Sequence, residues 1–251
     1  MLNSRNEYVI MAEVEGKHWW YKSLHELILK AIKKHSAIAD PTIIDAGCGT
    51  GGCLKYLENR GYKSSSGLDV SAYSIEFCKS KNLKVQKSDL KDIGLLYKDK
   101  SADIIISCDT FYFFTKEEQA EILRKFHKIL KQNGLVILNL PALKIFRGIH
   151  DKAVGIKDRF NKKIAKSIID PNMFTINKMT YWPFSLSFLI YLTRLQQRII
   201  MKFNPNYTVQ SDISLPPKLL NGFLLLLIRL ENIILKYKPF GSSIFVVLRK
   251  I

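Results

Sequence analysis

The sequence predicts an α/β protein with a doubly wound, mostly parallel sheet, and three observations support this. Apolar segments typical of strands alternate with helical patterns between residues 42 and 142. A glycine-rich turn joins the first strand to the first helix of this series, and acidic residues end consecutive strands. Alternating strands and helices are typical of a parallel sheet covered on both faces. Ligands of such sheets bind beyond the carboxyl ends of the strands, where the glycines and acids fall.

The first five strands are expected at residues 42–46, 65–70, 83–88, 102–109 and 135–140. Helices are expected at 52–60, 72–81 and 116–131, the last because its apolar residues recur every three or four positions. An amphipathic helix is also expected before the sheet, ending near Lys34. Beyond residue 142 the alternation breaks, and only 174–181 and 243–249 have the composition of further strands.

The glycine-rich turn reads Asp45-Ala46-Gly47-Cys48-Gly49-Thr50-Gly51-Gly52 and predicts a site for a nucleoside cofactor. Glycines allow positive φ angles and a close approach of the backbone to a ligand. The helix that follows points its unpaired N–H groups into the turn. Gly47, Gly49 and Gly52 also fit the G-x-G-x-x-G pattern of dinucleotide-binding proteins. The carboxylate of Asp45 would repel a pyrophosphate, whereas it suits the cationic methionine end of S-adenosylmethionine.

Three further aspartates follow the next strands of the series. Asp69 ends the second strand, Asp89 follows the third, and Asp109 ends the fourth. Each aspartate alone could be a helix cap. All three at the same edge of one sheet indicate a binding site.

The Asp-x-Gly-x-Gly-x-Gly turn resembles the first motif of class I S-adenosylmethionine-dependent methyltransferases. The resemblance implies a Rossmann-like, mostly parallel seven-stranded sheet with an antiparallel last strand and a helical insertion or cap. It implies that Asp69 binds the cofactor ribose and that Ser88-Asp89-Leu90 contacts the adenine. The complete set of cofactor-binding residues that it implies is Asp45, Gly47, Cys48, Gly49, Gly51, Asp69, Val70, Ser88, Asp89, Leu90 and Asp109.

A second group of motifs resembles a bacterial subfamily of these methyltransferases that is often linked to surface sugars and secondary metabolites. The motifs are Glu15-x-x-His18-Trp19-Trp20, His150-Asp151, residues 221–231 and Pro239-Phe240-Gly241-Ser242-Ser243. The chain is accordingly divided into an N-terminal helical lid (1–36), an S-adenosylmethionine-binding core (37–142), a basic and apolar helical cap with the sixth strand (143–242), and the last core strand (243–251).

Methyl transfer is an in-line displacement, so alignment of the acceptor is the main task, and positioning alone supplies about 7–11 kcal/mol. A hydroxyl acceptor also needs a base. His150 and Asp151 are the predicted catalytic pair, because they follow the fifth strand and histidine titrates near neutral pH. His18, Asp109 and Tyr112 are further candidates for the base.

Aromatic residues are expected around the acceptor. Trp19 and Trp20, next to His18, form either a lid over the site or part of the core. Relatives usually carry Asp-x-x-Glu-His after the fourth strand, whereas this chain has Asp109-Thr110-Phe111-Tyr112-Phe113. Tyr112 and its aromatic neighbours would therefore form a pocket wall that suits an apolar or ring-shaped acceptor.

The formal net charge is +17, from 39 basic and 22 acidic residues, and the segment from 142 to 203 alone has twelve Lys or Arg against three Asp. Such an excess attracts polyanions. The four cysteines lack metal-site spacing, so no metal is expected. No signal peptide is evident, and a cytoplasmic protein with reduced thiols is predicted, with peripheral contact to the inner membrane face as an alternative.

The apolar segments near the C-terminus are predicted to be helical but not to span a membrane. Residues 182–193 are too few for a span of roughly 20 residues, and Arg229 and Glu231 interrupt 219–235. In the second segment a narrow polar sector predicts an amphipathic helix. Such a helix covers an enlarged core in most proteins. Half of a homodimer interface and contact with an anionic membrane are the alternatives. The polar sector holds Lys218, Asn221, Arg229, Asn232 and Lys236, with Leu225 among them.

The sequence therefore predicts an S-adenosylmethionine-dependent methyltransferase that acts on a small molecule, such as a sugar, lipid-linked or secondary-metabolite acceptor. Oxygen is favoured over nitrogen as the methylated atom. An RNA methyltransferase is an alternative prompted by the charge, but the segment after Asp109 lacks the paired prolines of enzymes that methylate nucleic-acid amines. A dehydrogenase and a cofactor-binding, membrane-associated protein without turnover are two further hypotheses.

Overall fold

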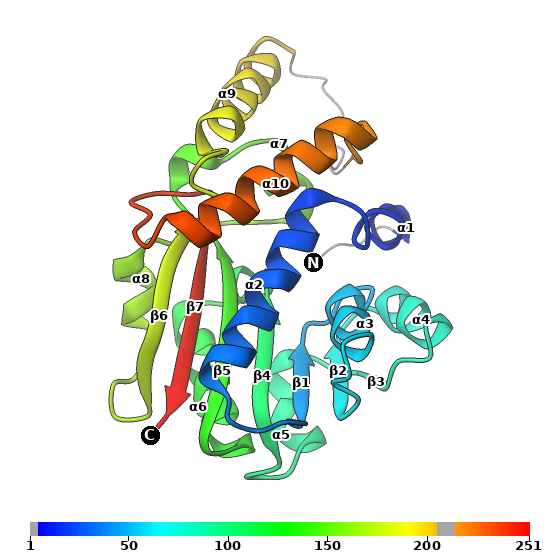
Figure 1. Cartoon of the computed structure of the whole chain (residues 1–251), viewed down its shortest axis with the longest axis vertical. Helices are drawn as coiled ribbons and strands as arrows, with labels where there is room; N and C mark the ends of the chain where they lie inside the picture. The colour runs from blue at the N-terminus through cyan, green and yellow to red at the C-terminus, as the bar shows by residue number, and fades with distance from the viewer. Residues whose placement is uncertain (1–4, 205–213) are drawn as a thin grey trace.

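A computed structural model describes residues 5–204 and 214–251 and confirms the predicted α/β class. Its strands form one sheet in the order β3-β2-β1-β4-β5-β7-β6, and β7 runs antiparallel to both of its neighbours (Figure 1). The strands are β1 Ile43–Ala46, β2 Ser65–Asp69, β3 Val85–Lys87, β4 Ala102–Cys108, β5 Leu130–Pro141, β6 Phe174–Trp182 and β7 Ser243–Lys250.

Helices cover both faces of the sheet and extend beyond one of its ends. The α-helices are α1 Arg5–Val14, α2 Trp19–His35, α3 Gly52–Glu58, α4 Ala72–Ser80, α5 Ile93–Leu96, α6 Lys116–Ile129, α7 Ile149–Val154, α8 Lys162–Ser167, α9 Ser187–Phe203 and α10 Lys218–Ile234. Residues 5–204 and 214–251 also form the short 3₁₀ turns η1 Leu90–Asp92, η2 Phe111–Phe113 and η3 Lys144–Phe146. Helix α1 was not anticipated from the sequence.

The fifth strand begins five residues earlier than expected, and helix α6 ends at Ile129 rather than at residue 131. Leu130 adopts an extended conformation (φ −68°, ψ 138°) immediately after α6 and pairs with Ala102 of β4. Its apolar side chain fits the helical stripe of α6 as well as the strand, so the sequence pattern does not separate the two.

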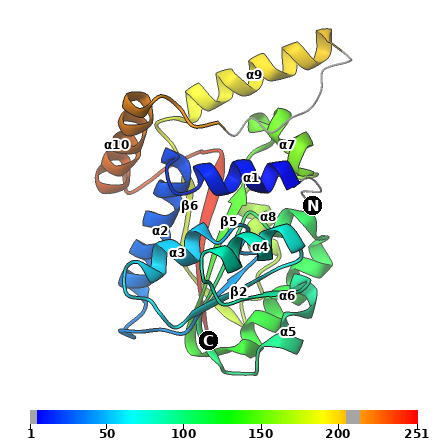
Figure 2. The same cartoon turned by 90° about the vertical axis from the view of Figure 1, so that its right-hand side faces the viewer.

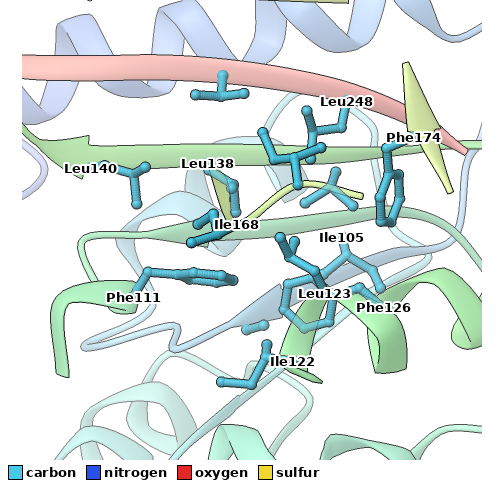
Figure 3. Close-up of a cluster of buried hydrophobic side chains, with 14 of the residues drawn as sticks. Ile105, Phe111, Ile122, Leu123, Phe126, Leu138, Leu140, Ile168, Phe174 and Leu248 are labelled. Carbon is cyan, nitrogen blue, oxygen red and sulfur yellow. The ribbon is translucent and has the colours of Figure 1, made fainter. Parts of the chain in front are cut away.

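The alternation of side chains along the strands places helices on both faces. Ile104 and Ile106 of β4 belong to the cluster under α2, whereas Ile105 belongs to the cluster under α6. Figure 2 shows α2 and α6 on opposite sides of the sheet. In Figure 3, Leu123 and Phe126 of α6 lie over the strands of their own face. This is the two-sided burial that a doubly wound sheet requires.

The segment predicted to be a cap (143–242) contributes strand β6 to the sheet and the long helices α9 and α10 at one end of the molecule. Strand β6 pairs with β7 and so forms an edge of the core sheet. Helices α9 and α10 lie at the end where the parallel strands have their carboxyl termini (Figure 1). None of the helices in the described residues combines the length and hydropathy needed to cross a bilayer.

Helix α10 turns its predicted polar sector toward α2 rather than toward solvent. The Asn221 side chain accepts a hydrogen bond from the Trp19 backbone N–H at 2.8 Å and donates to the Lys17 carbonyl at 2.9 Å. Arg229 forms an ion pair with Glu26 of α2. These contacts fix the rotation of the helix, because its polar groups find partners on the body of the protein.

Because of this orientation about its own axis, α10 covers the core with only part of its apolar surface. Only one flank of apolar residues is buried, namely Leu224, Leu225 and Ile228, which pack with Trp19 and Leu186. The opposite side of the helix is apolar and exposed. The exposed residues on that side are Leu219, Phe223, Leu226, Leu230, Ile233 and Ile234.

Candidate cofactor and acceptor site

A cavity of about 440 Å³ lies beyond the carboxyl ends of the parallel strands, under the N-terminal helices. It brings together most of the residues singled out from the sequence. Those that line it are His18, Trp19, Trp20, Asp45, Gly47, Cys48, Gly49, Asp69, Val70, Ser88, Asp89, Leu90, Asp109, Tyr112 and His150. Gly51 and Asp151 are the two predicted site residues that do not line it.

The glycine turn comes between β1 and α3 and forms one wall of the cavity. Gly47 and Gly49 have φ angles of 87° and 52°, in the left-handed region that L side chains rarely adopt. A Cβ atom at Gly47 would also overlap the side chain of Thr110. Gly51 instead packs against Cys78 and Leu83. The turn therefore leaves a backbone cradle of the kind that a nucleoside cofactor requires.

Asp45 is the central charge of this wall. Its side chain is buried at the end of β1, and burial, with Asp69 and Glu15 nearby, raises its pKa to about 7. Lys81 compensates the charge of Glu15, and a cationic ligand would compensate the charges of Asp45 and Asp69. The arrangement fits a positively charged ligand.

Glu15, just after α1, occupies the N-terminus of helix α3. Its carboxylate accepts a hydrogen bond from the Gly52 N–H at 3.1 Å and pairs with Lys81, which also donates to the Thr50 carbonyl at 2.8 Å. A helix N-terminus next to a glycine turn is where dinucleotide-binding proteins place the pyrophosphate. Here the protein places its own anion at that point. The Glu15-x-x-His18 motif was noticed in the sequence, but it did not reveal this role.

Asp69 and Asp89 both bind backbone N–H groups next to the cavity. Asp69 accepts hydrogen bonds from the backbone N–H groups of Gly49 at 3.0 Å and Ser71 at 2.9 Å. Asp89 caps η1 by accepting from the Lys91 N–H at 2.9 Å. Both side chains are held in place by the backbone, and both line the cavity.

The N-terminal aromatic residues also line the cavity and pack into the core. Trp19 belongs to the cluster that joins α2 to α10, and Trp20 stacks on Trp182 with ring centroids 5.4 Å apart. His18 begins α2 by accepting a hydrogen bond from the Trp20 N–H at 3.1 Å, and burial lowers its pKa to about 4. His18 is therefore neutral at physiological pH.

Asp109 lies at the end of β4 and is held by Asn139 of β5. The Asn139 side-chain amide donates to both Asp109 carboxylate oxygens, at 3.1 and 2.9 Å, and accepts from the Trp182 indole N–H at 2.8 Å. Burial raises the pKa of Asp109 to about 6, although the bonds from Asn139 oppose this shift. Asn139 was missed as a site residue. Its signal is a polar residue in an otherwise apolar strand.

The predicted catalytic pair is divided between two environments. His150, on α7, lines the cavity. Asp151 is buried in a two-point ion pair with Arg159, at 2.6 and 2.9 Å, and accepts from the Gly148 N–H at 3.1 Å. Arg159 lines the cavity and also donates to the Ala142 carbonyl at 3.0 Å. The catalytic roles of His150 and Asp151 stay predictions.

Aromatic side chains form the remaining wall. Tyr112 and Phe113 lie in η2 with their ring centroids 4.3 Å apart, and Phe114 and Phe146 complete this wall. Burial raises the pKa of Tyr112 well above its usual value, so its hydroxyl stays protonated. This part of the cavity suits an apolar or ring-shaped molecule.

The fold is Rossmann-like, and comparisons with known proteins show which proteins the chain resembles. Residues 44–138 match the family model of the methyltransferase domain. An uncharacterized methyltransferase of Oceanobacillus iheyensis is 27% identical over 124 residues, 49% of this chain and 58% of that protein. A malonyl-[acyl-carrier protein] O-methyltransferase of Bacillus cereus is 27% identical over 149 residues, 59% of this chain and 55% of that protein.

Solved structures agree on the fold. A SAM-dependent methyltransferase from Archaeoglobus fulgidus superposes with a TM-score of 0.58 at 18% identity, covering 90% of this chain and 94% of that one. The chain spans little more than half the length of the curated relatives it matches. Residues 44–138 therefore resemble a methyltransferase domain, and the fold is shared with a solved SAM-dependent methyltransferase.

Proposed function

We propose that this protein binds S-adenosylmethionine at the glycine turn and transfers its methyl group to a small, partly apolar acceptor, on oxygen rather than nitrogen. The observation that carries the proposal is the pair of carboxylates at the turn, Asp45 inside it and Glu15 on the N-terminus of α3. The aromatic wall around Tyr112 supports an apolar or ring-shaped acceptor. The O-methyltransferase activity in the name of the Bacillus cereus relative supports oxygen.

The same two carboxylates disfavour the dinucleotide alternative. A pyrophosphate at the turn would meet Asp45 and would have to displace Glu15 from the Gly52 N–H. Repulsion between like charges in a partly buried site is much stronger than in water. The sulfonium and ammonium groups of S-adenosylmethionine carry the opposite charge, so they would be attracted.

Each remaining wall of the cavity has a role in this proposal. Asp69 would hold the ribose hydroxyls, and Ser88, Asp89 and Leu90 would contact the adenine. Bound S-adenosylmethionine supplies the electrophilic methyl group. His150 would accept the proton of a hydroxyl acceptor, because it lines the cavity and a neutral imidazole has a ring nitrogen that can take up a proton. Asp151, engaged by Arg159, holds this guanidinium at the cavity wall.

Calorimetry with the two cofactor classes tests the proposal. We expect S-adenosylhomocysteine to bind with a measurable heat and NADH to give none under the same conditions. The product analogue is used because it forms the same adenosine contacts without turnover. Binding of NADH with no binding of S-adenosylhomocysteine would overturn the proposal.

The affinity for S-adenosylmethionine should also depend on pH through Asp45. The pKa of this carboxyl is raised to about 7, so it is ionised above pH 7 and protonated below it. A cationic ligand prefers the ionised form, and affinity should therefore fall by up to about tenfold per pH unit below 7. Titrations between pH 6 and 8 measure this fall. The Asp45→Asn variant should bind more weakly with a flatter profile, and an unchanged slope in this variant would rule Asp45 out as the titrating group.

A further inference from the structure

The outer sides of α9 and α10 are apolar and exposed to solvent. The proposed chemistry does not use them. Of the 24 large hydrophobic residues that are exposed in the described chain, 17 lie between residues 188 and 240. We call the exposed apolar residues of the two helices the outer apolar face. They are Phe188, Leu189, Leu192, Ile199, Ile200 and Phe203 of α9, and Leu219, Leu220, Phe223, Leu226, Leu230, Ile233 and Ile234 of α10.

The other side of each helix is fixed to the body of the protein. In α10, Asn221 and Arg229 bind residues near and within α2. In α9, the Gln197 side chain accepts a hydrogen bond from the Ile149 N–H at 3.1 Å, and Ile190 packs with the Trp19 cluster. Since these contacts orient both helices, their apolar sides face away from the protein. Figures 1 and 2 show both helices at the same end of the molecule.

The charge around this face is strongly positive. Residues 187–204 and 214–240 contain seven Lys or Arg and one acidic residue, Glu231; Arg229 is paired with Glu26 and Lys238 with Glu231, so five basic residues lie outside these two ion pairs. Glu231 is buried and neutralised by Lys238, with the charged atoms 2.8 Å apart. The basic residues are Arg194, Arg198, Lys202, Lys218, Arg229, Lys236 and Lys238.

These observations decide between the partners that an apolar face could take. A second copy would bring two basic surfaces together, in a chain whose net charge is already +17. An anionic bilayer offers both the apolar phase and the opposite charge. Helices with an apolar side and flanking basic residues lie in the plane of such a membrane. Each basic residue near the surface adds about 1 kcal/mol of attraction.

We propose that the outer apolar face docks this protein on an anionic lipid bilayer, with α9 and α10 lying in the interface. The docking does not depend on the methyltransferase activity. It has a geometric link to the site, because Ile190 and Arg194 of α9 also line the cavity. A docked molecule would therefore hold one wall of its cavity next to the lipid.

Vesicle flotation tests the proposal with the full chain. The wild type should float with vesicles of phosphatidylcholine and phosphatidylglycerol in equal amounts at low salt, and less with phosphatidylcholine alone or at high salt. The Leu219→Asp/Ile233→Asp variant should lose at least about tenfold in its partition coefficient, because two apolar anchors become anionic. Both residues are exposed, 90% and 74%, so the variant should fold. Its circular dichroism and thermal midpoint verify this.

Leu95→Asp is the matched control. Leu95 is 86% exposed and belongs to α5, at the opposite end of the molecule in Figure 1, so this variant should float like the wild type. Three results would overturn the proposal. In the first, the wild type does not float with anionic vesicles at low salt. In the second, Leu95→Asp loses as much of the partition coefficient as the double variant. In the third, light scattering shows a wild-type dimer and a monomeric double variant, and neither protein binds vesicles.

Discussion

Replacing Asp69 by alanine should weaken the binding of S-adenosylhomocysteine by at least about 100-fold. Hydrogen bonds to a charged group contribute about 1.5–3 kcal/mol each, and in the proposed function Asp69 accepts two from the ribose. The substitution also removes the acceptor that holds the Gly49 and Ser71 N–H groups, at 3.0 and 2.9 Å. The ligand contact and the shape of the glycine turn are therefore lost together.

Calorimetry on three variants separates these two losses. The two backbone N–H groups bind different oxygens of Asp69, so Asp69→Asn keeps an acceptor for one of them and removes the charge. Its affinity should lie between those of the wild type and Asp69→Ala. Asp40→Ala is the control, because Asp40 is an exposed residue that binds Ser64. It should bind the ligand as the wild type does. Unchanged affinity in Asp69→Ala would remove the ribose role from Asp69.

Replacing Asp151 by alanine should lower the free energy of unfolding by about 3–5 kcal/mol. The substitution leaves the Arg159 guanidinium buried without its counter-charge, and such uncompensated charges have costs of this size. The two side chains are only 3% and 5% exposed. Urea denaturation at neutral pH measures the loss.

A double-mutant cycle identifies the cause of this loss. Asp151→Ala/Arg159→Met removes both charges, so it should be more stable than Asp151→Ala alone. Asp158→Ala is the control, because the ion pair between Asp158 and Lys144 is exposed and 3.9 Å long, and its loss should change stability by less than about 1 kcal/mol. A stable Asp151→Ala protein that has lost activity would instead support the predicted role of Asp151 as a base.

The parts of the site that could be predicted are those that depend on local sequence. When a strand of a parallel sheet ends in an acid and leads through a glycine turn into a helix, the acid and the glycines lie at the carboxyl edge of the sheet. Asp45, Gly47, Asp69 and Asp109 therefore meet at one cavity, as their positions at strand ends require.

The parts that could not be predicted depend on contacts between distant segments. Trp19 and Asn221 are 202 positions apart, and the hydrogen bond between them helps to fix the rotation of α10. Hydrophobic periodicity identifies the apolar side of a helix, but it does not say that this side faces the core. Likewise, the ion pair with Arg159 is invisible in the spacing of His150 and Asp151.

The buried amide of Asn139 has only one orientation that satisfies both of its neighbours. An indole N–H can only donate, so the amide oxygen must face Trp182, and the NH₂ group is then directed at Asp109. Trp182 also stacks on Trp20 of the N-terminal segment. The packing of this segment and the ionised carboxylate of Asp109 therefore favour the same rotamer of the Asn139 amide. The Asn139 amide thus joins the carboxylate of Asp109 to the stacked rings of Trp182 and Trp20, so that one buried side chain connects the end of β4 with the N-terminal segment.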